Sequence, residues 1–376
     1  GAGANSACSR DTSATYTTKT SEGDRDGKSS SHSAALQVVS LEAALQELKA
    51  GFDADRSSAQ QGPRLELTQE LGQGSYGKVY AATWRGLRVA VKRMVFSQLP
   101  GDDGSAAARR RAAVLQEVAL NESLSHPNIV ATYSHDMRQL GQGQAVSDWQ
   151  LLIIQELCEG GSLLDVLVDC RLWDAARGLP LVHCVANILL DIAKGMAYIH
   201  GQNIVHSDLK PDNVLLKHSA DGMVAKVADF GFSVKMPAQQ THMSGVRHGT
   251  PMYMAPEVVT QGRASKAADV YAFGVMVWEL VHGRTAWDEA IAQFTPSVTD
   301  NVQTLRILPG LLSHWSVLEP AASHLAAARA LLAAEPALGP LSALGASCLS
   351  QQPGSRPSFE EVVGVLEELL RMHYVF

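Results

Sequence analysis

Four polar residues near the middle of the chain have the types and the order that phosphoryl transfer needs. Asp208, Lys210 and Asn213 stand together in HSDLKPDNVLL, and Asp229 follows in DFG. A carboxylate can orient or accept the proton of an attacking hydroxyl, and a lysine can neutralise charge on a transferring phosphoryl group. Mg²⁺ prefers oxygen ligands, commonly one or two protein carboxylates beside phosphate oxygens. We therefore predict Asp208 and Lys210 as catalytic residues, and Asn213 with Asp229 as magnesium ligands.

A glycine-rich stretch, GQGSYGKV at residues 72–79, precedes these residues and is suited to covering phosphate groups. Gly72, Gly74 and Gly77 lack a Cβ, so their backbone can approach phosphate oxygens closely. The same spacing of glycines occurs in dinucleotide-binding folds, where it follows a strand and opens a helix. Here β-like runs lie on both sides, which favours a strand-turn-strand flap. Taken alone, the motif also fits an ordinary glycine-containing hairpin.

A lysine on the next predicted strand indicates a second phosphate contact. Lys92 ends the stretch VAVK among small apolar residues, a pattern typical of a lysine that pairs with the α- and β-phosphates of a nucleotide. A carboxylate must hold such an ammonium group, and Glu117 in VLQEVAL lies on the following predicted helix. We predict that Glu117 is the ion-pair partner of Lys92 and count both among the catalytic residues.

The rest of the chain supplies two units that would position these residues. Short β-like runs with one helical stretch extend from Leu65 to residue 157, and mainly helical patterns follow to residue 372. The predicted fold class is α+β, with a small β-rich lobe that contains one key helix and a larger, mainly α lobe. Residues 1–35 have few large apolar side chains and predict a disordered tail, whereas residues 36–64 predict a short helix and a linker.

Composition and charge exclude several classes of protein. Hydrophobic residues make up 46% of the 376 residues, which is enough for a core, and the net charge is −7. This charge gives no general electrostatic reason to bind nucleic acid or an anionic membrane, so phosphate binding must be local. The five cysteines form no C-x-x-C pair, which favours reduced thiols in the cytoplasm. The most apolar stretch, residues 270–281, is too short to span a membrane.

Five motifs now stand in one order, since APE at residues 255–257 completes the series. From about Leu65 to Leu370 the chain resembles a eukaryotic protein kinase, with a small lobe at 65–157 and a large lobe at 158–372. The stretches DLKPDN and GTPMYMAPE resemble serine/threonine kinases, and WRGLRVAVK and SRPSF resemble the tyrosine-kinase-like group, which includes the Raf and mixed-lineage kinases. The resemblance implies a bilobal fold with ATP and Mg²⁺, or Mn²⁺, in the cleft, and protein Ser/Thr hydroxyls as acceptors.

The resemblance also assigns contacts to the nucleotide. Besides the three glycines and Lys92, Val79 at the end of the glycine-rich motif is expected to bind ATP. Ala90 and Leu215 would enclose the adenine from the two lobes. Glu156 and Cys158 would offer backbone hydrogen bonds from the hinge between the lobes.

Further residues are implied as supports rather than as catalysts. Gln155 would be the gatekeeper of the adenine pocket, and Thr250 in GTP would belong to the substrate-docking segment. Arg356 would pair with Glu257, and Asp269 would brace the backbone of the catalytic loop.

Two residues depart from the family pattern. Ser207 stands where many kinases have an arginine that binds a phosphate on the activation loop, so a strong ordering contact is lost while the residues of transfer remain. This predicts altered regulation and full activity without phosphorylation of Thr241 and Ser244. Asn121 stands where a large apolar residue usually packs against Phe230. A buried amide without partners costs about 1–3 kcal/mol, so either this helix is shifted or the active arrangement is marginal.

Two other functions therefore stay open. One is a pseudokinase-like scaffold that binds nucleotide or partners without transfer, and the other is a dual-specificity or tyrosine kinase. A dinucleotide oxidoreductase is disfavoured because its chemistry needs neither Lys92 nor HSDLKPDN nor DFG. The expected partners are ATP and protein substrates, with no nucleic acid and no membrane span, and the sequence does not indicate an oligomeric state. The expected location is cytoplasmic, unless a targeting segment preceded Gly1.

Overall fold

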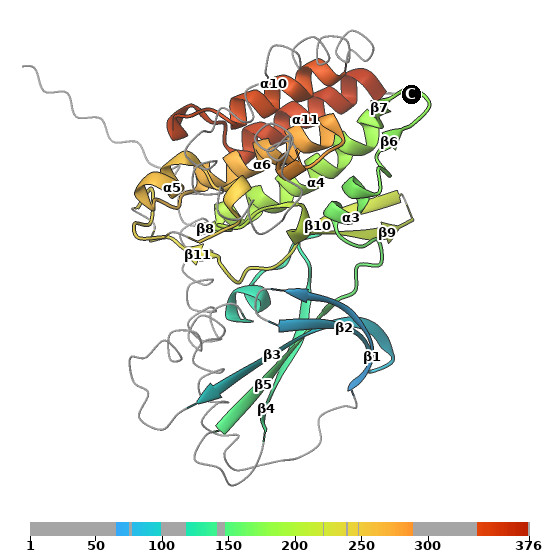
Figure 1. Cartoon of the computed structure of the whole chain (residues 1–376), viewed down its shortest axis with the longest axis vertical. Coiled ribbons are helices and arrows are strands. Elements are labelled where there is room, and N and C mark those ends of the chain that lie inside the picture. The colour runs from blue at the N-terminus through green and yellow to red at the C-terminus, as the bar shows by residue number, and fades with distance from the viewer. Residues whose placement is uncertain are drawn as a thin grey trace, which may run out of the picture.

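The structure is a computed structural model that describes residues 65–74, 77–98, 118–140, 147–220, 222–237, 240–246, 248–288 and 337–374. The tail and helix predicted before residue 65, Glu117 and most of the Ala-rich region at 285–340 lie outside these residues. The described residues form a β-sheet unit, at the bottom of Figure 1, and a larger helical unit above it. The predicted α+β, bilobal class is confirmed.

The smaller lobe is an antiparallel five-stranded sheet with the order β1-β2-β3-β5-β4. On one face Val91 packs with Ile154, and on the other face Ile153 joins the main core together with Leu120 from a helical segment at 118–123. The apolar runs of the central strands are thus explained by burial on both faces. The strands are β1 Leu65–Gly74, β2 Gly77–Trp84, β3 Leu87–Gln98, β4 Thr132–Leu140 and β5 Ser147–Glu156.

The register of this sheet gathers predicted nucleotide-binding residues on one face. Val79 on β2 pairs with Lys92 on β3, and Ala90 on β3 pairs with Gln155 on β5. Directly paired residues share a face of a sheet, and residues two apart on a strand do so as well. Val79, Ala90, Lys92 and Gln155 therefore belong to one surface.

The larger lobe is built on two buried helices, α4 and α6. α11 packs against α4 and α10 against α6 (Figure 1). The helices are α3 Leu163–Val168, α4 Val182–Gly201, α5 Pro256–Gln261, α6 Lys266–His282, α10 Leu338–Cys348 and α11 Phe359–Tyr374, with one-turn helices η1 Pro211–Asn213, η2 Pro251–Tyr253 and η4 Pro353–Ser355. Paired short strands complete the lobe: β6 Trp173–Asp174 with β7 Leu179–Pro180, β8 Ile204–Val205 with β11 Val234–Lys235, and β9 Val214–Ser219 with β10 Gly222–Val227.

Among the described residues, α4 is the one helix with the length and hydropathy to cross a membrane, and 56% of its apolar window is buried inside the molecule. Core helices of soluble proteins pass the same test. The stretch singled out from the sequence, residues 270–281, lies within α6 instead.

Candidate active site between the lobes

The catalytic loop between β8 and η1 is held by one buried carboxylate on α6. Asp269 on α6 is 2% exposed. Its oxygens accept the backbone N–H groups of His206, at 2.8 Å, and of Ser207, at 2.9 Å. Its Oδ2 also lies 2.8 Å from Nε2 of His200. The predicted bracing of the loop backbone by Asp269 is confirmed.

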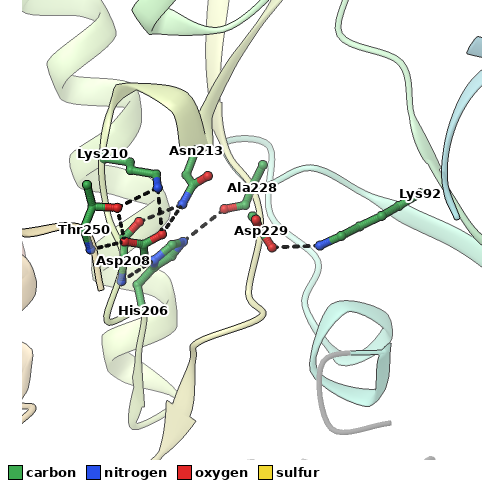
Figure 2. A network of polar contacts seen from close by, with 8 residues as sticks. All are labelled: Lys92, His206, Asp208, Lys210, Asn213, Ala228, Asp229 and Thr250. Atoms are coloured by element: carbon green, nitrogen blue, oxygen red, sulfur yellow. Dashed lines mark hydrogen bonds and ion pairs between the residues drawn. The ribbon is translucent and has the colours of Figure 1, made fainter. Parts of the chain in front are cut away.

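Asp208 lies at the centre of a compact polar network, which Figure 2 shows. Its Oδ1 accepts hydrogen bonds from the backbone N–H and the hydroxyl of Thr250, at 2.7 and 2.8 Å. Its Oδ2 lies 3.1 Å from Nζ of Lys210 and accepts Nδ2 of Asn213 at 3.1 Å. Lys210 donates to Thr250 Oγ1 at 2.6 Å. The structure thus brings together Asp208, Lys210 and Asn213, as their motif predicts, and adds Thr250 from 42 positions downstream.

The donor set at Asn213 and Asp229 suits a hard cation. Asn213 uses its amide nitrogen for the carbonyl oxygen and the carboxylate of Asp208, and Figure 2 shows its amide oxygen on the side that faces Asp229. An amide oxygen and a carboxylate are ligands that Mg²⁺ accepts. Among the described residues no cluster of three His, Cys, Asp or Glu forms a complete protein metal site. A cation here would therefore share its coordination with phosphate oxygens or water.

Lys92 reaches across from the small lobe to Asp229. Its Nζ lies 2.8 Å from Asp229 Oδ1, and the lysine side chain is 8% exposed. Burial pushes the pKa of Asp229 upward, but the charge and hydrogen bond of Lys92 outweigh it, so that the pKa lies below its usual range. Asp229 also holds a left-handed backbone, with φ 59°, which is uncommon for a residue other than glycine. Its carboxylate is therefore ionised and fixed in direction. The predicted partner Glu117 lies outside the described residues, so that ion pair stays a prediction.

The glycines of the first motif meet different demands. A Cβ on Gly77 would collide with the carbonyl oxygen of Arg93 on β3, whereas a Cβ on Gly72 would meet nothing within 4 Å. Gly77 is thus required by the packing of β2 on β3. Gly72, near the end of β1, has open space beside its Cα. β1 and β2 carry the two ends of the motif and pair antiparallel up to Gly74 and Gly77, which confirms that strands lie on both sides of it.

The hinge after β5 rests on β9 of the large lobe. The N–H of Gly160 donates to Leu216 O at 2.8 Å, and the N–H of Leu216 donates to Gly161 O at 2.9 Å. A Cβ on Gly160 would come within 2.7 Å of Leu216 O, which explains a glycine at this position. Leu215, the expected adenine contact, forms a bridge with Ser162 in the same region.

The two expected hinge residues differ in what they can offer a ligand. The backbone N–H of Glu156 donates to Ala131 O at 2.9 Å, so this N–H is already engaged within the protein. Cys158 is half-buried, and this burial raises the pKa of its thiol to about 12. The thiol therefore stays protonated at neutral pH.

The side chain of Glu156 forms an ion cluster that the sequence did not indicate. It is buried and contacts Lys217 on β9 at 2.6 Å and Lys226 on β10 at 2.9 Å. Burial raises its pKa, but hydrogen bonds from both lysines and from the N–H of Ala131 bring the pKa below the usual range. The cluster joins the end of β5 in the small lobe to two strands of the large lobe.

His206 is a second contribution that sequence reasoning missed, although its place at the start of the motif could have signalled it. Its ring is buried, accepts the N–H of Asp208 at Nδ1, 3.3 Å away, and donates from Nε2 to Ala228 O at 3.1 Å. The ring thus joins the catalytic loop to the residue before Asp229 (Figure 2).

The structure also describes the remaining support, Arg356, and the two residues that depart from the pattern, Asn121 and Ser207. Arg356 forms a bidentate pair with Glu257, at 2.7 and 2.9 Å, as predicted. Asn121 is buried with 4% exposure, as its position implies. Ser207 has a left-handed backbone, with φ 68°, and its shielded Oγ has no hydrogen-bond partner among the described residues.

Comparisons of the sequence with known proteins identify one family. Residues 65–366 match the protein kinase domain family. The chain is 36% identical over 233 residues to mitogen-activated protein kinase kinase kinase 10 of Mus musculus, covering 60% of this chain and 22% of that protein. It is 31% identical over 313 residues to mitogen-activated protein kinase kinase kinase 11 of Rattus norvegicus, covering 81% and 31%. With mitogen-activated protein kinase kinase kinase 7 of Bos taurus the figures are 29%, 82% and 44%. The chain spans less than half the length of each of these relatives.

Proposed function

Because the chain belongs to the protein kinase family, we propose that it is a serine/threonine kinase that transfers the γ-phosphoryl group of ATP to hydroxyls of protein substrates. The observation that carries the proposal is the meeting of Asp208, Lys210 and Asn213 in one hydrogen-bonded network beside the ionised Asp229. Phosphoryl transfer rests on positioning and charge stabilisation, and these are the groups it uses.

Each residue has a defined task in this proposal. The carboxylate of Asp208, held in place by Thr250 and Asn213, orients the substrate hydroxyl and takes its proton. Lys210 stabilises negative charge on the group in transit, and Lys92 holds the α- and β-phosphates. Mg²⁺, or Mn²⁺, bound by Asn213 and Asp229 would neutralise charge on the β- and γ-phosphates.

The nucleotide contacts follow from the surface that the sheet presents. Val79 and Ala90 share the face of Lys92, while Leu215 and the backbone of Glu156 and Cys158 close the other side. Gly72, Gly74 and Gly77 cover the phosphates. Glu117, which directly precedes the helical segment at 118–123, is proposed to steady Lys92.

The choice of Ser/Thr hydroxyls is supported by Thr250. Its hydroxyl lies between Lys210 and Asp208, at 2.6 and 2.8 Å, so the lysine of DLKPDN and the threonine of GTP act together at the acceptor position. We further propose that activity does not depend on an arginine–phosphate contact, because Ser207 directs only its backbone N–H to Asp269 and offers no cationic group.

A transfer assay with labelled ATP and a generic basic protein tests the function, with Asp229→Asn as the matched inactive variant. Phosphoserine and phosphothreonine in the product are expected. No transfer by the wild type, or equal transfer by the variant, overturns the proposal. Phosphotyrosine as the major product would instead show a dual-specificity or tyrosine kinase. ATP-dependent thermal stabilisation without transfer would show a pseudokinase-like scaffold.

A further inference from the structure

The segment between DFG and APE is ordered along 240–246 without any charged contact to residue 207. Met243 and Ala264 exchange two backbone hydrogen bonds, at 2.8 and 3.0 Å, and the N–H of Val246 donates to Gly262 O at 3.0 Å. These bonds fix the middle of the segment on the loop that follows α5. They do not reach Thr250, the residue that contacts Asp208.

His248 supplies a connection at that end. Its ring stacks on Phe232, with centroids 5.0 Å apart and planes inclined by 26°. Its Nε2 lies 3.3 Å from the carbonyl oxygen of Phe232 and donates a hydrogen bond when it carries the proton. Phe232 directly follows DFG, so the contact joins the metal-binding motif to the residues just before Thr250.

The surroundings of His248 favour a neutral ring. Burial lowers its pKa, and the nearby Asp208 opposes this shift only in part. A neutral imidazole with a proton on Nε2 can stack and donate at once. Neither contact requires a phosphate.

Ser207 lies close to the residues that follow His248 in the chain. Ser207, His248 and Thr250 line a small cavity of about 20 Å³, which is room for roughly one water molecule. Gly249 is fitted closely here, because its φ is 128° and a Cβ would lie 2.8 Å from Ser207 O. The substrate-docking segment therefore packs directly on the catalytic loop at this point.

We propose that His248 is a positioning residue that replaces the arginine–phosphate contact: by its stack and hydrogen bond to Phe232 it holds Gly249 and Thr250 against the catalytic loop. The inference rests on the proposed kinase function and concerns its regulation. It assigns to a neutral histidine a task that does not depend on phosphorylation of the segment.

A double-mutant cycle tests the proposal with phosphatase-treated protein. His248→Ala and Phe232→Ala should each lower kcat/KM for the protein substrate at least tenfold, while the Kd for the nucleotide stays within twofold. Because the two side chains act through each other, the two losses should not multiply. The kcat/KM of the double variant should lie within threefold of that of the less active single variant. His242→Ala is the control, since His242 lies in the same segment and contacts the neighbouring Thr241.

The outcomes separate this inference from the proposed function. Transfer by the wild type together with near wild-type activity of His248→Ala overturns the role of His248 and leaves the kinase function standing, whereas no transfer by the wild type overturns the function itself. If the losses of the two single variants multiply in the double variant, the role of His248 is overturned as well. Should His248→Ala fail to fold, as judged by its thermal midpoint, the same cycle with His248→Gln keeps the proposal falsifiable.

Discussion

At the scale of single residues, Asp208 separates chemistry from binding. Asp208→Asn keeps an acceptor for Thr250 but removes the carboxylate, so we expect kcat to fall by roughly 10²–10⁴-fold, the usual contribution of a general base. The nucleotide Kd should change little, because Lys92 and Asp229 remain. Steady-state kinetics and nucleotide titration measure both. Asp169→Asn, at an exposed site, is the control. If Asp208→Asn retained a tenth of wild-type kcat, the role assigned to Asp208 would be contradicted.

Glu279 gives a pH-dependent prediction. Burial raises its pKa from 4.5 to about 7, and the carboxylates of Asp212 and Asp288 add to this, although Tyr253 and the N–H of Ala286 donate to Oε1. Among the described residues its Oε2 has no partner. Folding thus favours the protonated form, and the unfolded chain loses this proton at lower pH. The stability associated with Glu279 should therefore be present below pH 4.5 and be lost as pH rises towards 7.

Glu279→Gln cannot ionise and removes this dependence. The free energy of unfolding of the variant minus that of the wild type is the quantity to compare across pH. It should be more favourable to the variant above pH 7 than at acid pH by on the order of 3 kcal/mol. Thermal midpoints of both proteins between pH 5 and 8 measure the effect. Glu367→Gln, which alters an exposed ion pair with Lys194, should show no such trend. A difference that is constant with pH would exclude ionisation of Glu279 as the cause.

At the scale of elements, the segment before α5 is held by its backbone and by packing. Thr241 and Ser244 are exposed, and the backbone bonds of the segment do not involve their side chains. The double variant Thr241→Ala, Ser244→Ala should therefore keep its activity within about twofold of wild type. Thr250→Ala should lower activity, since it removes the hydroxyl between Lys210 and Asp208. A tenfold loss in the double variant would show that phosphorylation of the segment is needed after all.

The elements also show what a sequence can predict. Strands β1 to β3 and the hairpin at the glycines follow from alternation and from flanking residues, which are local signals. The partners of Lys217 and His248 do not, because Glu156 lies 61 positions from Lys217 and Phe232 lies 16 from His248. Lysine, glutamate and histidine are common on surfaces, so no pattern marks these as buried contacts. Lys92 shows the same limit, since its contact with Asp229 spans 137 positions.

At the scale of the whole molecule, Glu156 ties the lobes together. It ends β5, while Lys217 and Lys226 belong to the large lobe, and Lys226 also donates to Pro127 O at 2.6 Å before the start of β4. The side chains of Glu156 and Lys226 are 8% and 10% exposed, and that of Lys217 is 35% exposed. Loss of the carboxylate would leave the buried Lys226 without its counter-charge, which is costly in a protein interior.

Glu156→Gln should therefore lower the free energy of unfolding by about 3 kcal/mol, and Lys217→Met should lower it less, because Lys217 remains partly hydrated. The lobes should also separate more readily, so the release of a fluorescent ATP analogue should become faster in Glu156→Gln. Urea unfolding and stopped-flow release measure the two effects, with Glu70→Gln in an exposed pair with Lys78 as the control. If Glu156→Gln changed the free energy of unfolding and the release rate no more than Glu70→Gln does, the cluster would contribute as little as an exposed ion pair. The hinge backbone and its packing on β9 would then be what joins the lobes.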